Sequence, residues 1–170
     1  MELHALVATP CALPSMPRIV ALLLAELAQP QPQLQRLNQL FGGDPALAAR
    51  LLEQANGALF RATGEVVGVP EALALLSQAQ LHSLVRSAPL GAASRSVPGV
   101  NLPQFWRYSH NTARLARALA GFVQHNQLAA YTAGLLHGVG ELVLHLGYAE
   151  KAQSLNTLVP PLDYRRAKIE

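Results

Sequence analysis

Apolar residues recur at three- and four-residue steps along most of this chain. In the segment "SMPRIVALLLAELAQ" these steps connect Met16, Ile19, Leu23 and Leu27. This spacing is typical of an amphipathic α-helix, which has about 3.6 residues per turn. Leu and Ala dominate the apolar residues, whereas Val, Ile and aromatic residues are sparse, and this balance favours helices over sheets. We therefore expect an all-α fold, built as an irregular multi-helix bundle.

Glycine and proline mark where the early helices end and begin. The segment "QLQRLNQLFGG" places Leu34, Leu37 and Phe41 on one face and ends in a glycine pair, and glycine is a frequent helix terminator. The next segment starts with Asp44 and Pro45. These are preferred residue types for the N-cap and the first helical position. A new helix is therefore expected to begin at this point.

A turn-rich stretch precedes one long helix. Further helices are expected from residue 70 and over residues 78–88, after which proline and glycine crowd residues 89–103. Proline ends a helix because it lacks the amide hydrogen and its ring clashes with the preceding turn. This stretch is a candidate boundary between two helical halves, and the second half opens with a helix over residues 103–125.

Steps of about 100° per residue separate two faces of the long helix. The apolar arc, expected to face the core, contains Phe105, Trp106, Ser109, Thr112, Ala113, Leu115, Ala116, Leu119, Ala120 and Val123. The polar arc, expected to be solvated, contains Arg107, His110, Arg114, Arg117 and His125. Its arginines, Arg107, Arg114 and Arg117, are also candidate contacts for an anion or another ligand, because guanidinium groups match phosphate geometry.

Composition narrows the classes of function. Only 14% of the 170 residues are charged, against about 25% in typical domains, so we expect some apolar surface to meet another copy or another domain. The net charge is +3 and the basic residues are scattered, which argues against nucleic-acid binding. One cysteine, Cys11, fits a reducing cytoplasm. No run is long enough for a membrane span, so we expect a soluble cytoplasmic domain.

The segment "AGLLHGVGELVLHLG" contains the most distinctive histidine. His137 precedes Gly138, and Gly140 follows two residues later. We expect His137 to be a buried imidazole bonded to a backbone carbonyl, beside a turn or a close helix contact that the glycines permit. An alternative is chelation of a metal ion by His137, Glu141 and His145, which would share one face of an unbroken helix. The two glycines argue against an unbroken helix.

Several segments together resemble one bacterial signalling domain. In order, they are "LPSMPRIVALLLAEL", "DPALAARLLEQANGALF", "VPEALALLSQAQLHSLV", "FWRYS" and "AGLLHGVGELVL". The chain is on this basis similar to the HDOD domain, a relative of the His-Asp metal-dependent phosphohydrolases. The resemblance implies an HD-like helical bundle over residues 13–170, after an N-terminal extension of residues 1–12. It also implies that the chain ends where the family continues into further helices.

The resemblance also assigns the positions that hold the metal ion in the catalytic relatives. The first ligand, a histidine in those enzymes, falls on Tyr108, and the His-Asp pair falls on His137 and Gly138. A neutral phenol is a poor ligand at pH 7, and the carboxylate of the pair is absent. The catalytic relatives also have a further metal-binding aspartate downstream, and no motif aligns Asp163 with it. We therefore expect vestigial positions, with no catalytic residue, no bound metal and no cofactor.

The sequence thus predicts a non-catalytic regulatory domain that works through protein–protein contacts. The resemblance implies partners such as receiver domains or cyclic-di-GMP-related modules, and a homo-oligomer is a further candidate. One alternative is a residual metal-dependent phosphohydrolase that recruits His110, His137 and Asp163. The other is a sensor of a nucleotide or second messenger, held in the former active-site cleft near Tyr108 and His137 by arginines.

Overall fold

The computed structural model of the protein describes residues 13–57, 64–89, 97–149 and 152. The helices in these residues are α2 (Pro17–Leu27), α3 (Leu34–Phe41), α4 (Pro45–Ala55), α5 (Val69–Leu75), α6 (Gln78–Arg86), α7 (Leu102–Phe122), α8 (Gln127–Leu136) and α9 (Val139–Gly147). The expected all-α class is confirmed. An isolated antiparallel bridge between Val97 and Val100 is the one strand-like pairing recorded in the described ranges. The N-terminal extension and Asp163 lie outside the described residues.

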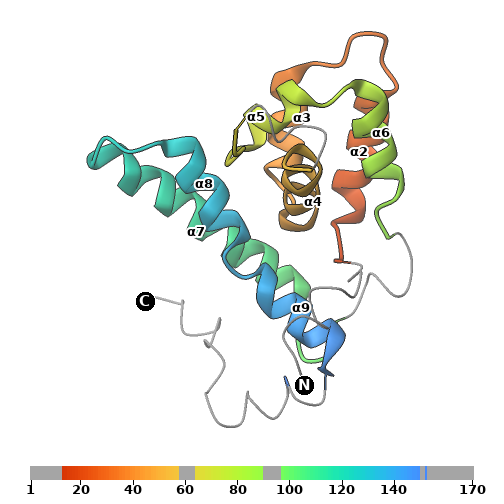
Figure 1. Cartoon of the computed structure of the whole chain (residues 1–170). Helices are drawn as coiled ribbons and strands as arrows, with labels where there is room; N and C mark the ends of the chain where they lie inside the picture. Colours follow the sequence, from red (N-terminus) through yellow and green to blue (C-terminus); the bar gives the residue numbers. More distant parts are fainter. Residues whose placement is uncertain (1–12, 58–63, 90–96, 150–151, 153–170) are drawn as a thin grey trace.

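The helices form a bundle and a hairpin (Figure 1). Helices α2 to α6 gather into the bundle, whereas α7 and α8 pack against each other as a long antiparallel hairpin. The hairpin touches the bundle where α8 contacts α4, and its tip projects away from the bundle to the left in Figure 1. Helix α9 follows α8 and returns toward the start of α7.

Side-chain caps define several helix starts. The Asp44 carboxylate accepts a hydrogen bond of 3.0 Å from the Leu47 amide, and Pro45 occupies the first helical position of α4, as expected from the sequence. Helix α6 begins with a reciprocal capping box between Ser77 and Gln80. Such caps satisfy amide groups that have no partner within the helix. Residues next to the helix starts therefore fix where α4 and α6 begin.

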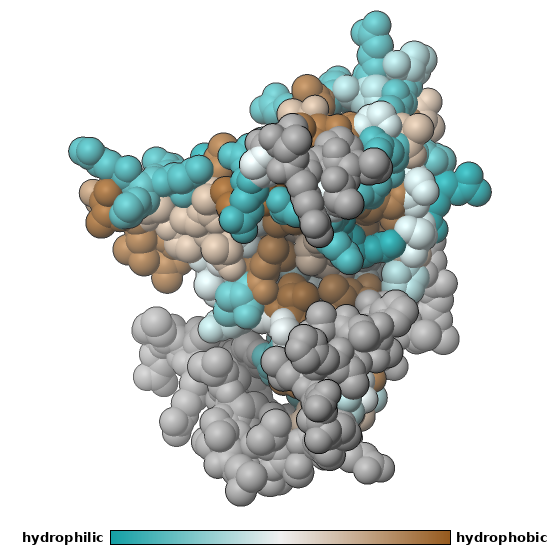
Figure 2. Space-filling model, viewed as in Figure 1, coloured by the Kyte–Doolittle hydropathy of each residue, from teal (hydrophilic) through white to brown (hydrophobic). Residues whose placement is uncertain are grey.

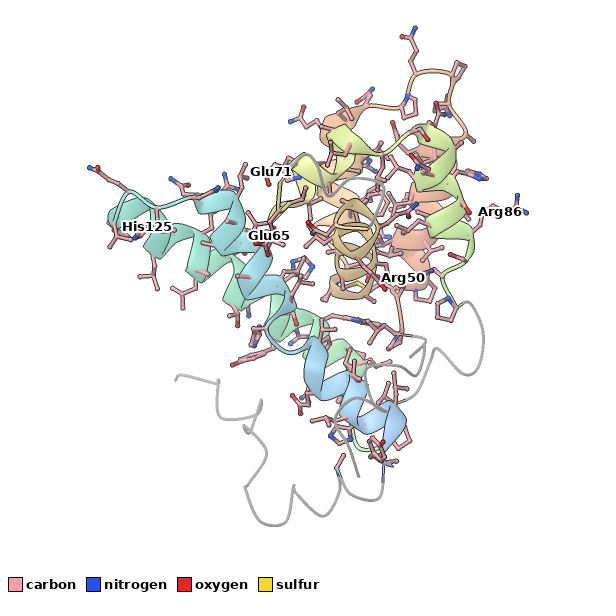
Figure 3. All side chains as sticks on the ribbon, viewed as in Figure 1. Arg50, Glu65, Glu71, Arg86 and His125 are labelled. Atoms are coloured by element: carbon pink, nitrogen blue, oxygen red, sulfur yellow. The ribbon has the colours of Figure 1, made fainter. Side chains whose placement is uncertain are left out.

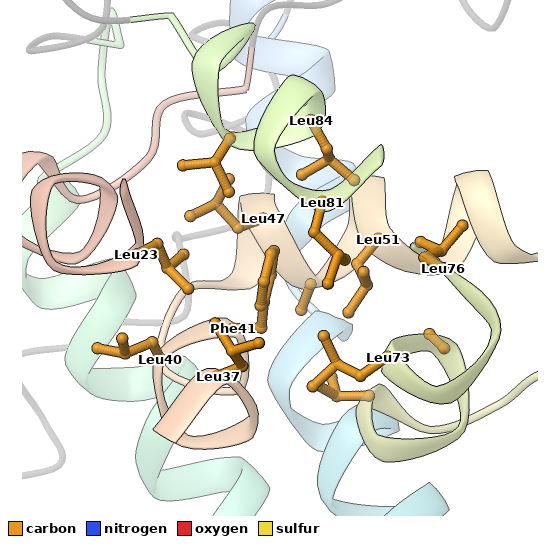
Figure 4. Packing of buried hydrophobic residues seen from close by; sticks show 14 of the residues in the cluster. Leu23, Leu37, Leu40, Phe41, Leu47, Leu51, Leu73, Leu76, Leu81 and Leu84 are labelled. Atoms are coloured by element: carbon orange, nitrogen blue, oxygen red, sulfur yellow. The ribbon is translucent and has the colours of Figure 1, made fainter. Parts of the chain in front are cut away.

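A first hydrophobic core fills the bundle (Figure 4). The buried residues on α2 are Val20, Leu23 and Leu27, and on α3 they are Leu37, Leu40 and Phe41. The assignment of Leu34 to the buried face of α3 was wrong, because this side chain is 64% exposed. Leu34 points to the same side of α3 as Phe41, but it is the first residue of the helix, and the core does not extend to this end.

A second, smaller core lies at the base of the hairpin. Its buried members are Val97, Leu102, Phe105 and Leu142, and Trp106 packs against them half-buried. This arrangement confirms Phe105 and Trp106 as core anchors. The first core also draws in Ala113 from α7 and Leu135 from α8, so the hairpin is tied to both clusters. The proposed boundary at residues 89–103 stays a prediction.

Candidate functional site

The turn "FGGD" at residues 41–44 connects α3 and α4, and side chains of the hairpin form hydrogen bonds with it. The Tyr131 hydroxyl of α8 donates a hydrogen bond of 3.0 Å to the Gly42 carbonyl. Nε2 of His110, on α7, donates to the Gly43 carbonyl at 2.8 Å. His110 is therefore half-buried at this joint, which corrects the expectation of a solvated histidine. At this position the polar arc of α7 meets a backbone carbonyl of the bundle.

Burial sets the protonation of two groups at this joint. Asp44 is fully buried, and desolvation raises the pKa of its carboxyl to about 6, despite hydrogen bonds from the backbone amides of Leu47 and Met16 that favour the ionised form. Burial also raises the pKa of the Tyr131 hydroxyl, against smaller opposing effects of Arg117 and Arg114. Tyr131 therefore stays protonated near neutral pH and remains a donor to Gly42.

The two vestigial side chains, Tyr108 and His137, meet on the hairpin. The ring of Tyr108 on α7 lies 5.1 Å from the ring of His137 at the end of α8, centroid to centroid, at an interplanar angle of 56°. Nδ1 of His137 donates a hydrogen bond of 2.7 Å to the Gly134 carbonyl, so the expected backbone partner is confirmed. Its expected burial was wrong, because His137 is exposed.

These positions do not fit a catalytic metal ion. With Nδ1 committed to Gly134, His137 can offer Nε2, but the adjoining position is Gly138 and the facing ring is a phenol. Catalytic sites for divalent cations usually combine several nitrogen or oxygen ligands with an open position. In the described part of the chain, no three His, Cys, Asp or Glu side chains form a group able to hold a metal ion.

The alternative chelate on one helix face is also not assembled. His137 is the C-cap of α8, and α9 starts anew at Val139. His145 is buried, and its Nδ1 donates a hydrogen bond of 2.8 Å to the Pro98 carbonyl. It thus bonds to the loop that contributes Val97 to the second core. The imidazoles of His137 and His145 serve different parts of the fold.

Two glycines allow close packing, and a third does not. A Cβ atom on Gly134 would lie 2.8 Å from the Ala113 Cα, so α7 and α8 cross backbone to backbone there. A Cβ atom on Gly138 would lie 2.9 Å from the Phe105 ring. Around Gly140 nothing lies within 4 Å. The expected close contact therefore involves Gly138, while Gly140 has no such role.

The three candidate arginines do not converge on one site. Arg107, Arg114 and Arg117 are all exposed, but only Arg117 lines the hollow of about 180 Å³ between α3, α5 and the hairpin. Asn38, Gln39 and Tyr131 line the same hollow. Arg107 and Arg114 lie two turns apart on one edge of α7, because seven residues complete nearly two helical turns. No single anion site uses all three.

Large apolar side chains in the second half of α7, from residue 115 onward, are exposed, although the apolar arc was expected to face the core. Exposed fractions are 61% for Leu115, 55% for Leu119, 85% for Phe122 and 64% for Val123. We call these four side chains, together with Tyr108, the outer face of the hairpin. Figure 2 shows hydrophobic surface on the projecting arm, on the side turned away from the bundle. The arc was assigned to the core because periodicity does not reveal which partner a helix face has.

A second feature of this region was missed in the sequence, although it is visible there. Residues 72–140 contain five arginines and no aspartate or glutamate. In Figure 3, Glu65 and Glu71 lie on the side of the hairpin that faces the bundle, and His125 marks its tip. The outer face of the hairpin therefore has a basic edge and no acidic side chain of its own helices. Counting charges over windows longer than one helix would have found it.

No helix among the described residues is both long enough and apolar enough to cross a membrane. The long helix α7 contains 21 residues, but its arginines and polar residues are distributed along its length.

Comparisons with known proteins agree with this geometry. The family model of the HDOD domain matches residues 13–168. An uncharacterised protein of Treponema pallidum (strain Nichols) is 27% identical over 156 residues, which is 88% of this chain and 30% of that protein.

Two similar solved structures are of the MmoQ response regulator of Methylococcus capsulatus str. Bath. One has a TM-score of 0.73 and 24% identity, and covers 87% of this chain and 62% of the regulator. A fragment of the same regulator, residues 20–298, has a TM-score of 0.71 and 25% identity, and covers 85% of this chain and 57% of the fragment. The chain thus spans less than a third of the Treponema protein and less than two thirds of the regulator.

Proposed function

The chain belongs to the HDOD domain family, and we propose that it is a non-catalytic regulatory module of bacterial signalling that acts through protein–protein contacts. The observation that carries this proposal is the Tyr108–His137 pair. The two rings pack together at the position where catalytic relatives hold a metal ion, and the glycine after His137 supplies no carboxylate. What the scaffold retains is a rigid helical surface.

Phosphoester hydrolysis would need a means to activate water. In metal-dependent phosphohydrolases a divalent cation lowers the pKa of bound water and neutralises charge on the phosphoryl oxygens. The ring that packs against Tyr108 is the imidazole of His137, and His110, which the alternative mechanism recruits, is committed to the Gly43 carbonyl. The remaining candidate ligand, Asp163, lies outside the described residues.

The signalling context is supported by the regulator whose structure is similar. That protein is called a response regulator, and the chain covers only part of it. We propose that the partners are adjacent signalling modules, such as receiver or cyclic-di-GMP-related domains. The single cysteine fits a reducing compartment, so we place the protein in the cytoplasm.

Metal content and hydrolysis together test this proposal. The purified chain is analysed for Mn, Fe and Zn, and assayed on bis(p-nitrophenyl) phosphate with each metal added. We expect no stoichiometric metal and no hydrolysis above the rate with metal alone. His125→Ala serves as the control, because His125 is an exposed histidine at the hairpin tip. Stoichiometric metal and hydrolysis that are both lost in His137→Ala but kept in His125→Ala would refute the proposal.

A second candidate function is sensing of a small anion in the hollow beside Arg117. Guanidinium, amide and phenol groups converge there, but the hollow of about 180 Å³ is smaller than ligand pockets of about 300–1,000 Å³. Inorganic phosphate therefore fits better than a nucleotide. A ligand at 100 times its Kd stabilises a fold by about 2.7 kcal/mol, so a thermal shift with phosphate that disappears in Arg117→Ala would support this function.

A further inference from the structure

We propose that the outer face of the α7–α8 hairpin is a docking site for an amphipathic helix with an acidic edge, presented by a partner protein. This inference rests on the proposed function and specifies the chemistry of the partner. It depends on the spacing of the exposed apolar residues, on the charges beside them, and on the poorer match of a second copy, of residues 151–170 and of a membrane.

The exposed apolar side chains in the second half of α7 form one ridge. At about 100° per residue, Leu115, Leu119 and Phe122 fall within an arc of about 60° on α7. Tyr108 falls on the same arc two turns earlier, and its ring reaches His137 at the end of α8. Spacings of i, i+4 and i+7 are those by which helices recognise one another. The ridge therefore presents the anchor pattern of a helix–helix contact.

The charges beside the ridge select the partner. Arg107 and Arg114 lie about 80–100° to one side of Leu115 by the same helical steps, and both are exposed. Helices α7 and α8 contain no aspartate or glutamate of their own. Opposite charges at the rim of an apolar contact steer association and fix the register. A helix whose apolar stripe is flanked by Glu or Asp matches both features.

Other occupants match less well. A second copy would present the same hairpin, which has no acidic residue to pair with Arg107 or Arg114. The C-terminal segment 151–170 contains four basic and two acidic residues and the pair Pro160-Pro161, so its net charge is basic and prolines interrupt a helix. A membrane surface usually attracts helices with many Lys and Arg residues, whereas this edge has two.

Synthetic helical peptides test the docking site on the whole chain. The probe has leucines at i, i+4 and i+7 and glutamates along one edge, and the control probe has lysines in place of the glutamates. Fluorescence anisotropy reports binding of each peptide. We expect the Glu peptide to bind and the Lys peptide to bind about tenfold more weakly. Two exposed ion pairs together contribute roughly this factor.

Variants locate the contact. Phe122→Ser is expected to abolish binding of the Glu peptide, since Phe122 is 85% exposed and its replacement leaves the cores intact. Leu34→Ser, at a leucine of α3 that is 64% exposed, is the control and should bind normally. The double variant Arg107→Glu with Arg114→Glu should reverse the preference in favour of the Lys peptide. Arg86→Glu, on the exposed surface of α6, should not.

Several outcomes would overturn the inference. They are no binding of the Glu peptide to the wild-type chain, equal binding of both peptides, or binding that Phe122→Ser does not affect. Dimerisation in analytical ultracentrifugation that Phe122→Ser abolishes would assign the face to a second copy. Binding to phosphatidylserine vesicles that Phe122→Ser abolishes would assign it to a membrane. If the peptide fails while the chain holds no metal and hydrolyses nothing, the docking site is wrong and the regulatory proposal stands.

Discussion

Replacing Gly134 by alanine is expected to force α7 and α8 apart. The new methyl group would lie 2.8 Å from the Ala113 Cα, 2.9 Å from the Thr112 carbonyl oxygen and 3.0 Å from the Ala113 amide nitrogen. All three contacts are with backbone atoms, which cannot move aside as a flexible side chain would. The hairpin must therefore widen at this crossing, although it also supports the Tyr108–His137 pair and the outer face.

The expected free-energy change has two parts of opposite sign. Replacing glycine by alanine inside a helix stabilises it by about 0.8–1.0 kcal/mol. Overpacking of a close contact costs about 1–3 kcal/mol, and occasionally more. Because all three contacts are with backbone atoms at 3.0 Å or less, the cost lies in the upper part of this range, about 2–3 kcal/mol, and we expect Gly134→Ala to lower the free energy of unfolding by about 1–2 kcal/mol. Gly140→Ala is the matched control, because nothing lies within 4 Å of its new methyl group, and it should stabilise the chain by about 0.5–1 kcal/mol.

Urea denaturation followed by far-UV circular dichroism measures both variants. The midpoints should move in opposite directions, with similar slopes if the unfolded states are alike. If Gly134→Ala were as stable as the wild type, or were stabilised like Gly140→Ala, the two backbones could not be in contact at this crossing. The packing argument for the hairpin would then fail.

Variants at three further positions test other parts of the structure. The pKa of Asp44 is raised from 3.8 to about 6, so the folded state favours the protonated carboxyl. This preference adds about 3 kcal/mol to the free energy of unfolding below pH 3.8, and the addition is lost as the pH rises through 6. Asp44→Asn should remove this fall in the free energy of unfolding, which is measured by urea denaturation between pH 3 and 7. Tyr131→Phe removes the bond to Gly42 and should cost about 1 kcal/mol, read from the midpoint of a urea titration. Ser77→Ala should cost a similar amount, about 0.5–2 kcal/mol, through its lost cap, and Ser77→Asp should restore it.

Local patterns predicted the elements of the fold well. The caps and breaks around residue 44 and the long helix near residues 102–122 are confirmed, because proline, glycine and N-cap residues act within one turn of the chain. Leu34 was misplaced because the first turn of a helix need not face the core. Periodicity identifies an apolar stripe, but the partner of that stripe depends on segments far away in sequence.

The candidate site was predicted less completely, for the same reason. His110 lies on the polar arc of α7, yet it meets a carbonyl 67 residues away, which no local pattern reveals. The exposure of Leu115 and Phe122 depends on whether another element covers them. The closeness of Tyr108 and His137 was implied by the family resemblance and not by spacing. The charge asymmetry, by contrast, was present in the sequence throughout.

Paramagnetic broadening by Mn²⁺ decides whether the Tyr108–His137 face is a metal centre or a surface for proteins. Amide signals of the ¹⁵N-labelled chain are recorded while Mn²⁺ is added to a stoichiometric amount. If the regulatory account is correct, Tyr108, His137 and Gly138 broaden no more than the surroundings of His125 at the hairpin tip. Selective and saturable broadening at those three positions, absent in His137→Ala, would contradict it.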